Sequence, residues 1–175
     1  DTTYQVFQNG FGGKDKLVNI EEIWGSNFAD VFIAGSGNDT IYGQGGDDLF
    51  VSSATSGENS FFGGIKGSTS NDSGTITYSS YDNNGTALGG ITDNTHYVVG
   101  NLNNPKIDVY LTNNNALVKS DYINGIKNLT GGAGNDTLTG KDGASSILKG
   151  GAGNDTFYMS TGFDNSGTIQ GDLLF

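Results

Sequence analysis

The 175-residue chain contains no cysteine and no arginine, and only one proline, one histidine, one methionine and one tryptophan. The lack of cysteine excludes disulfides, thiolate metal sites and a cysteine nucleophile. Nineteen acidic residues against eight lysines give a net charge of −11, which opposes binding to the phosphate backbone of a nucleic acid. No apolar run is long enough to cross a bilayer, and the N-terminus shows no basic and apolar signal sequence, so we expect no membrane insertion.

Glycine and aspartate dominate what is present. Thirty glycines disfavour helices, because glycine is costly in a helix interior, and their irregular spacing excludes collagen. Sixteen of the nineteen acidic residues are aspartate, and the glutamates are Glu21, Glu22 and Glu58. Aspartate beside glycine and asparagine is typical of tight turns and of oxygen ligands for a hard cation.

A short Gly-rich segment recurs along the chain. GSGNDTI at 35–41 is repeated as GAGNDTL at 132–138 and GAGNDTF at 151–157, with looser copies beside them. A large apolar residue follows each aspartate, or its substitute, by two positions. These residues form two ladders with a spacing of mostly nine residues, namely Ile23, Phe32, Ile41, Phe50 and Phe61, and then Leu129, Leu138, Ile147 and Phe157.

A nine-residue period divides into a Gly-rich turn and a three-residue strand with one inward side chain. One such strand buries too little to form a core, but stacked coils align their apolar residues in columns. We therefore predict an all-β solenoid with two repeats in each coil and turns that alternate between two edges.

The nonapeptide Gly-Gly-x-Gly-x-Asp-x-(large apolar)-x resembles the RTX, or haemolysin-type calcium-binding, repeat. Residues 35–50 and 131–157 carry the resemblance most closely, and the segments 20–25 and 126–131 look like the lead-in to such repeats. The resemblance implies a calcium-binding parallel β-roll, a form of β-solenoid, that holds several Ca²⁺ ions in its turns.

Calcium prefers six or more oxygen ligands, which a turn carboxylate and the backbone carbonyls of two neighbouring turns together provide. Turns on one edge are two repeats apart, so the ligands of one ion are separated by about eighteen residues. The predicted ligands are the side chains of Asp30, Asp39, Asp48, Asn59, Asp72, Asp136 and Asp155, and the turn residues Gly35, Gly37, Gly43, Gly45, Gly131, Ala133, Gly134, Gly150, Gly151 and Gly153.

The spacing pairs these side chains across neighbouring coils. Asp30 pairs with Asp48, and Asp136 with Asp155. Asp39 pairs with Asn59 in a weaker site, because an amide replaces a carboxylate, and Asp72 is a further candidate partner of Asp48. The turn at 140–145 carries Ser145 where an aspartate belongs, so we assign no ion to it.

The middle of the chain departs from the repeat. We predict short strands at 75–78, 97–99 and 106–111, and turns at 83–85 and 124–125. The chain then divides into a first RTX block with its lead-in at 1–67, an irregular β-rich segment at 68–124 and a second RTX block at 125–175. One continuous solenoid with an irregular middle is the preferred interpretation, and two small rolls joined by an independent β-domain are the alternative.

No catalytic motif is visible, and His96 is the only histidine, so we expect no enzymatic activity. The favoured hypothesis is a calcium-binding structural module of a bacterial surface protein, an S-layer protein or large adhesin, that folds and assembles on calcium binding. The alternative is an accessory C-terminal module of a secreted exoenzyme (protease, lipase or epimerase) or toxin. The resemblance implies type I secretion to the exterior or the cell surface in both cases.

Self-association or contact with other surface components is the expected partner class. A cell-surface glycan is a further candidate partner, with Trp24, Tyr78 and Tyr81 as the aromatic residues that could stack on sugars.

Overall fold

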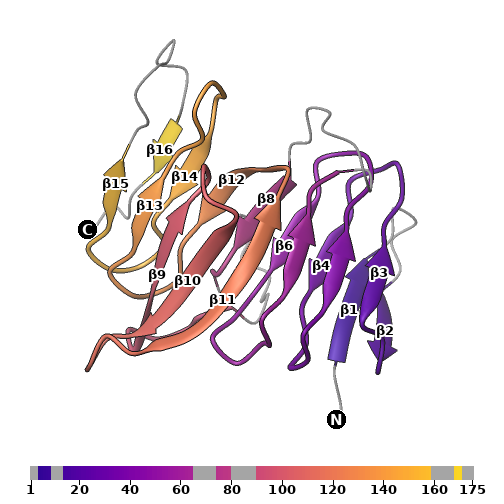
Figure 1. Ribbon diagram of the computed structural model, residues 1–175, viewed down its shortest axis with the longest axis horizontal. Helices are drawn as coiled ribbons and strands as arrows, with labels where there is room; N and C mark the ends of the chain where they lie inside the picture. Colours follow the sequence, from indigo (N-terminus) through magenta and orange to yellow (C-terminus); the bar gives the residue numbers. More distant parts are fainter. Residues whose placement is uncertain (1–3, 9–13, 65–73, 80–89, 159–167, 171–175) are drawn as a thin grey trace.

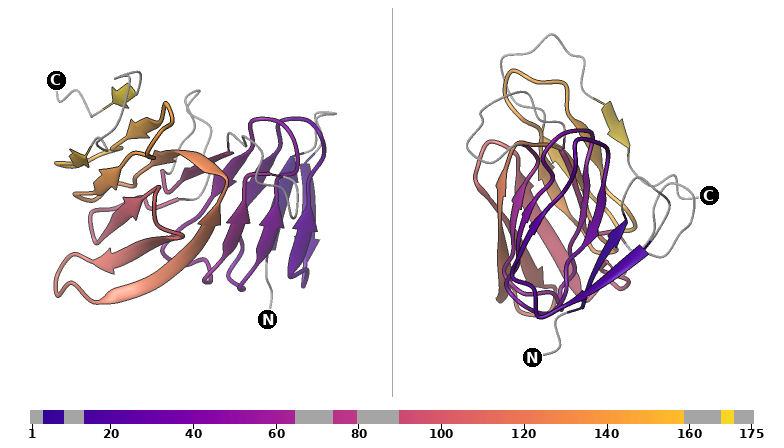
Figure 2. Two further views of the ribbon diagram at one scale, coloured as in Figure 1. Left: turned by 45° about the horizontal axis from the view of Figure 1, so that its top comes forward. Right: turned by 90° about the vertical axis from the view of Figure 1, so that its right-hand side faces the viewer.

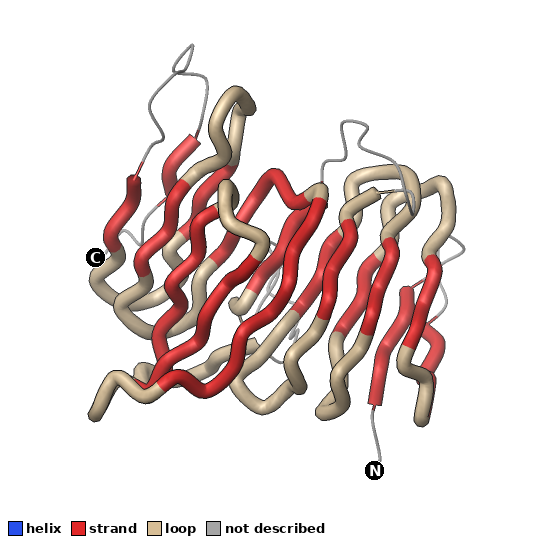
Figure 3. Tube along the Cα trace, viewed as in Figure 1, coloured by secondary structure: helices blue, strands red, loops and turns tan. Residues whose placement is uncertain are grey.

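Strands and turns make up the whole of the described chain (Figure 1, Figure 3). The computed structural model describes residues 4–8, 14–64, 74–79, 90–158 and 168–170, and within them the strands form two sheets of eight strands each. The all-β prediction is therefore confirmed. No helix capable of spanning a membrane occurs in these ranges.

The first sheet contains one hairpin, five further strands from the two RTX blocks and one strand from the middle segment. In spatial order its strands are β16 (Thr168–Gln170), β14 (Ile147–Lys149), β12 (Ile126–Thr130), β8 (Gly74–Thr77), β6 (Leu49–Val51), β4 (Val31–Ile33), β1 (Tyr4–Gln8) and β2 (Lys14–Val18).

The second sheet faces the first, as the view along the row of strands shows (Figure 2, right). In spatial order its strands are β15 (Thr156–Tyr158), β13 (Thr137–Thr139), β9 (His96–Asn101), β10 (Lys106–Leu111), β11 (Leu117–Asn124), β7 (Ser60–Phe62), β5 (Thr40–Tyr42) and β3 (Glu22–Trp24).

Successive short strands of the first block alternate between the two sheets. Strand β3 pairs in parallel with β5, with Ile23 opposite Ile41, while β4 pairs in parallel with β6, with Phe32 opposite Phe50. Each strand thus meets the strand two repeats later, which is the eighteen-residue coil that the sequence predicts.

The core lies between the sheets, and each short strand of the first block contributes one inward residue to it. All five residues of the first predicted ladder are buried, and the rings of Phe32 and Phe50 stack with their centroids 5.4 Å apart. A column of this kind buries apolar surface in strands too short to do so alone, because each coil covers the next.

The second ladder requires one correction. Ile147, which the sequence placed in the core, is 41% exposed, whereas its neighbour Leu148 is fully buried opposite Leu129. The turn before β14 contains one residue more than the regular turns, so the strand starts one position later. A one-residue shift moves every side chain of a strand to the opposite face.

The middle segment continues both sheets. Strand β8 pairs in parallel with β6 and with β12, while the antiparallel strands β9, β10 and β11 connect β13 to β7 in the second sheet. Strands from all three predicted segments therefore share the two sheets. The strands predicted at 75–78, 97–99 and 106–111 are confirmed, but the sequence analysis missed β11 and the hairpin β1–β2.

The corrected register predicts different costs for two adjacent substitutions. Leu148→Ala should destabilise the calcium-loaded protein by about 2–5 kcal/mol, because it leaves a cavity between the sheets. Ile147→Ala should change stability by no more than about 0.5 kcal/mol, because the side chain faces solvent. Urea denaturation in calcium measures both values, and equal effects would contradict the register.

Candidate metal centre

Each regular turn ends in an aspartate whose carboxylate folds back over the start of the same turn. The Oδ2 atom of Asp30 accepts a hydrogen bond from the Ser26 N–H at 2.7 Å, and Oδ2 of Asp136 accepts one from the Gly132 N–H at 2.7 Å. These bonds hold the turn closed and fix the carboxylate inside it, so Asp30 and Asp136 are each only 1% exposed.

The same carboxylates connect neighbouring coils. Oδ1 of Asp48 accepts a hydrogen bond from the Asp30 N–H at 3.0 Å, and Oδ1 of Asp155 accepts one from the Asp136 N–H at 2.9 Å. The structure thus brings together the two pairs that the spacing predicts.

Oxygen atoms from two neighbouring turns on the same edge converge beside the first glycine of a turn. A Cβ atom at Gly25 would lie 2.8 Å from Asp30 Oδ2 and 2.4 Å from the carbonyl oxygen of Gly43, which belongs to the turn one coil further on. A Cβ atom at Gly131 would lie 2.0 Å from Asp136 Oδ2 and 2.4 Å from the carbonyl oxygen of Gly150. A carboxylate and a carbonyl from adjacent turns are hard oxygen donors that suit Ca²⁺.

One of these carboxylates also has a buried oxygen that lacks a donor. Among the described residues no group donates a hydrogen bond to Oδ1 of Asp30, although this atom is inaccessible to solvent. A buried carboxylate oxygen is costly unless a hydrogen-bond donor or a cation compensates it. The residues present therefore fit a cation at the turns 25–30 and 43–48.

A comparison with known protein families finds the RTX calcium-binding nonapeptide repeat, in four copies, in residues 24–54 and 130–165. The chain contains RTX calcium-binding repeats. The matched residues lie in the first and the last of the three predicted segments, and residues 55–129 lie outside the match. No curated protein and no solved structure matches the chain.

The RTX repeats bind calcium, and the chain is in this respect a calcium-binding module of the RTX kind. Within the described ranges no three His, Cys, Asp or Glu side chains lie close enough to hold a metal ion. Each ion would therefore depend on backbone carbonyls as well as on the aspartates, as the converging oxygens of Gly43 and Gly150 indicate.

The remaining predicted carbonyl ligands lie in these same turns. Gly151 and Gly153 have φ angles of +90° and +112°, a conformation that residues with a Cβ atom rarely adopt. The other turn residues of the prediction are Gly35, Gly37, Gly45, Ala133 and Gly134, and their role as ligands stays a prediction.

Asn59 pairs with Asp39, as the spacing predicts, but its amide makes one hydrogen bond that a carboxylate could not make. Its Oδ1 accepts a hydrogen bond from the Asp39 N–H at 3.0 Å, and its Nδ2 donates to the carbonyl oxygen of Gly57 at 2.9 Å. The atom that replaces the second carboxylate oxygen is thus a donor and not an ion ligand. Asp72, the other candidate partner of Asp48, lies outside the described residues.

The turn without an aspartate is one residue longer than the sequence analysis assumed. Ser146, and not Ser145, occupies the position before β14, where it is 2% exposed and its Oγ accepts a hydrogen bond from the Lys141 N–H at 3.1 Å. The hydroxyl closes this turn as the carboxylate closes the RTX turns, without bringing a negative charge.

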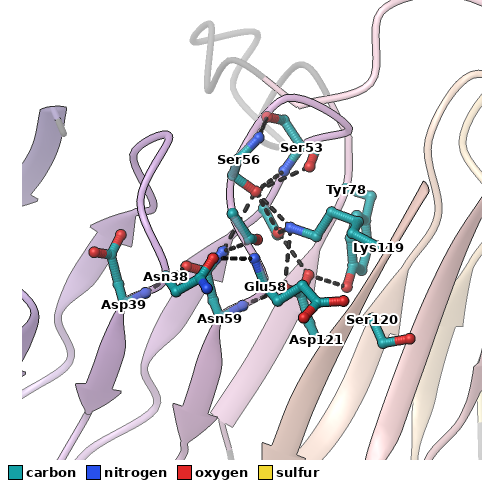
Figure 4. Close-up of polar contacts among 12 residues, drawn as sticks. Asn38, Asp39, Ser53, Ser56, Glu58, Asn59, Tyr78, Lys119, Ser120 and Asp121 are labelled. Atoms are coloured by element: carbon teal, nitrogen blue, oxygen red, sulfur yellow. Dashed lines mark hydrogen bonds and ion pairs between the residues drawn. The ribbon is translucent and has the colours of Figure 1, made fainter. Parts of the chain in front are cut away.

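The sequence analysis missed Asp121, which occupies the aspartate position of the coil after Asn59 (Figure 4). Its Oδ1 accepts a hydrogen bond from the Asn59 N–H at 2.9 Å, the same link that joins the RTX coils. Ile123 follows it by two residues, which is the signal that could have identified it. The residues before Asp121 form a long strand in place of a Gly-rich turn, and this hid the match.

Burial changes the acidity of one turn carboxylate. Desolvation, with a smaller contribution from the charge of Asp155, raises the pKa of Asp136 to about 7, although the hydrogen bonds from the Val98 and Gly132 N–H groups oppose this shift. A raised pKa means that the cation-free turn binds a proton more tightly than the unfolded chain does.

The close packing of oxygens predicts that an alanine substitution lowers stability at one of two glycines that begin a turn and leaves it unchanged at the other. Gly43→Ala should destabilise the calcium-loaded protein by about 1–3 kcal/mol through overpacking, because its Cβ atom would lie 2.0 Å from Asp48 Oδ2. Gly140→Ala is the matched control, because its Cβ atom would lie 3.7 Å from the nearest atom. Thermal unfolding in calcium measures both, and equal losses would contradict the tight packing around Asp48.

The raised pKa of Asp136 predicts proton release on calcium binding. Between the unfolded pKa of about 3.9 and the folded value the cation-free turn is protonated, so its stability falls as the pH rises through about 7. Calcium requires the carboxylate and displaces this proton. Calorimetry in two buffers of different ionisation enthalpy, in an osmolyte that keeps the cation-free turn folded, should detect the release at about pH 6 but not at about pH 8.5. In an open turn Asp136 ionises at about pH 3.9 and has no proton to release.

Two variants identify the source of the proton. Asp136→Asn should abolish the release, whereas Asp30→Asn, in the first block, should leave the contribution of the second block in place. Release that persists in Asp136→Asn would assign the proton to another group.

Proposed function

We propose that the chain is a calcium-folded structural module of a bacterial surface protein, an S-layer protein or large adhesin, exported by type I secretion. The observation that carries the calcium part is the convergence of Asp30 and Asp136 carboxylate oxygens with carbonyls of the following turns. The surface role is supported by the composition, which is rich in glycine and acidic residues and lacks cysteine.

The calcium-bound form that we propose is a parallel β-roll with ions at the turn pairs 25–30 with 43–48 and 131–136 with 150–155. The parallel pairing of β4 with β6 and of β13 with β15 supports this arrangement. We propose no ion at the turn that ends in Ser146, because it contributes no carboxylate.

Calcium should control folding because the turn carboxylates are buried. Asp30, Asp39, Asp48 and Asp136 are each 2% exposed or less, and the chain carries a net charge of −11. An ion that binds only the folded turns stabilises the fold by mass action. The RTX turns of such a chain would stay open during export from a cytosol poor in calcium and close outside, where modules of this class bind calcium at about 10⁻⁴–10⁻³ M.

We propose a role in self-association or in contact with other surface components, without catalysis. The imidazole of His96 is half-buried, and its Nδ1 lies 2.9 Å from Thr95 Oγ1 and 3.8 Å from an Asp93 carboxylate oxygen, so this nitrogen faces groups of the turn directly before it. Of the aromatic residues suggested for glycan stacking, Tyr78 is fully buried, Trp24 is exposed and Tyr81 lies outside the described residues.

The test is to purify the surface protein that contains this module (the parent protein) and to add calcium to it in steps, starting from excess chelator. Circular dichroism should show β-structure that increases at millimolar calcium, as expected for an extracellular module with a dissociation constant of about 10⁻⁴–10⁻³ M. Light scattering and negative-stain microscopy should then show ordered sheets or filaments as calcium neutralises the acidic surface.

Two results would contradict the proposal, each in a different part. The same folded spectrum in excess chelator and in calcium would refute the calcium-controlled fold. A parent protein that stays monomeric in calcium and gains hydrolase or epimerase activity would refute the surface role in favour of an accessory module of an exoenzyme.

A further inference from the structure

Asp121 in β11 is the buried carboxylate of the coil that follows Asn59, which we call the central coil. It is fully buried, and the Tyr122 N–H that follows it donates to the Asn59 carbonyl oxygen at 2.7 Å, so its backbone is in register with the turn aspartates of the first block. The residues before Asp30 form a Gly-rich turn, whereas the residues before Asp121 belong to a strand. The coil of Asp121 therefore offers no Gly-rich turn to an ion.

Both oxygens of Asp121 are nevertheless compensated by groups of the chain itself (Figure 4). Oδ2 accepts hydrogen bonds from Ser52 Oγ and from the Tyr78 hydroxyl, each at 2.7 Å. Oδ1 accepts the Asn59 N–H and lies 2.9 Å from Nζ of Lys119. Four donors therefore surround this carboxylate, whereas Oδ1 of Asp30 has no donor among the described residues.

The ammonium group of Lys119 is itself fully engaged. The side chain is 3% exposed, and besides Asp121 its Nζ donates to Ser52 Oγ at 2.8 Å and to Ser56 Oγ at 2.5 Å. Three acceptors match the three hydrogens of an ammonium group. Ser52 and Ser56 lie in the turn between β6 and β7, so the lysine connects this turn to β11.

We propose that Lys119 is a built-in cation that neutralises the buried carboxylate of the central coil, so that this coil is closed without calcium. A tethered ammonium does not dissociate when calcium is withdrawn, because it is part of the chain. The group connects residues far apart in sequence, since Asp121 is 69 residues from Ser52 and 43 from Tyr78. It therefore joins the first block to the middle segment in either calcium state.

This inference goes beyond the proposed calcium-controlled fold, because it assigns one coil to a different cation. The flanking RTX turns should open in chelator, while the contacts among the turn 52–57, Tyr78 and β11 persist. The module would then retain a folded centre from which both blocks form when calcium is added.

Hydrogen exchange of individual amides tests the inference. In excess chelator the amides of Asn59 and Tyr122, which form the central links, should stay protected in the wild-type protein, while the amides of Asp30 and Asp136 should exchange rapidly. Lys119→Met should accelerate exchange at Asn59 and Tyr122 in chelator by about a hundredfold or more, the change expected when a buried carboxylate loses its partner.

Two further variants control for general effects of the substitution. Lys106→Met removes a charge from an exposed lysine of β10 and should leave these amides unchanged. Lys119→Met combined with Asp121→Asn removes both charges and should restore part of the protection, because the carboxylate is no longer buried without a cation.

The inference is overturned if the Asn59 and Tyr122 amides lose protection in chelator as fast as that of Asp30, or if Lys119→Met behaves as Lys106→Met does. Protection of Asp30 and Asp136 that persists in chelator would instead refute the calcium-controlled fold. The comparison of the lysine variants would still decide the role of Lys119.

Discussion

A carboxylate buried at the end of a turn, as in Asp30, Asp39, Asp48 and Asp136, is the constraint on which the rest of this structure depends. Asp30, Asp48 and Asp136 are inaccessible to solvent, and each accepts a backbone N–H from its own turn or from a neighbouring coil. These bonds set the shape of the turn and the register between coils, but they leave a negative charge inside the protein. Burial of a charge is costly unless it is neutralised, so such a turn favours a bound cation or, as at Asp136 below about pH 7, a proton.

The apolar columns and the polar turns repeat together because both follow the coil. Phe32 and Phe50 stack in the core, while Asp30 and Asp48, two residues before them, are joined at the edge. A side chain that shifted by one residue in either column would disturb the other as well. This coupling explains why three-residue strands with a single inward side chain adopt one register.

The regular blocks were predictable from sequence for the same reason. Once Ile23, Phe32 and Ile41 fix the period, the inward residues and the facing aspartates follow by counting, as the link between Asp136 and Asp155 confirms. Counting failed where the chain inserts a residue, so that Leu148 and Ser146 took the places expected for Ile147 and Ser145. It also failed at Asp121, because the period does not show that an antiparallel hairpin returns the chain to the same edge of the sheet.

Two solutions to the buried charge thus occur in one pair of sheets. The RTX turns present carboxylate and carbonyl oxygens at which a dissociable ion fits, while the central coil presents to Asp121 the hydroxyls of Ser52 and Tyr78 and the ammonium of Lys119. The difference follows from the local backbone. A Gly-rich turn places a backbone carbonyl beside the carboxylate of the neighbouring coil, whereas the strand around Lys119 pairs its carbonyls within the sheet and leaves only a side chain to supply the positive charge. A coil that exchanges its turn for a strand must therefore bring its own cation, and this makes its stability independent of the calcium concentration that governs its neighbours.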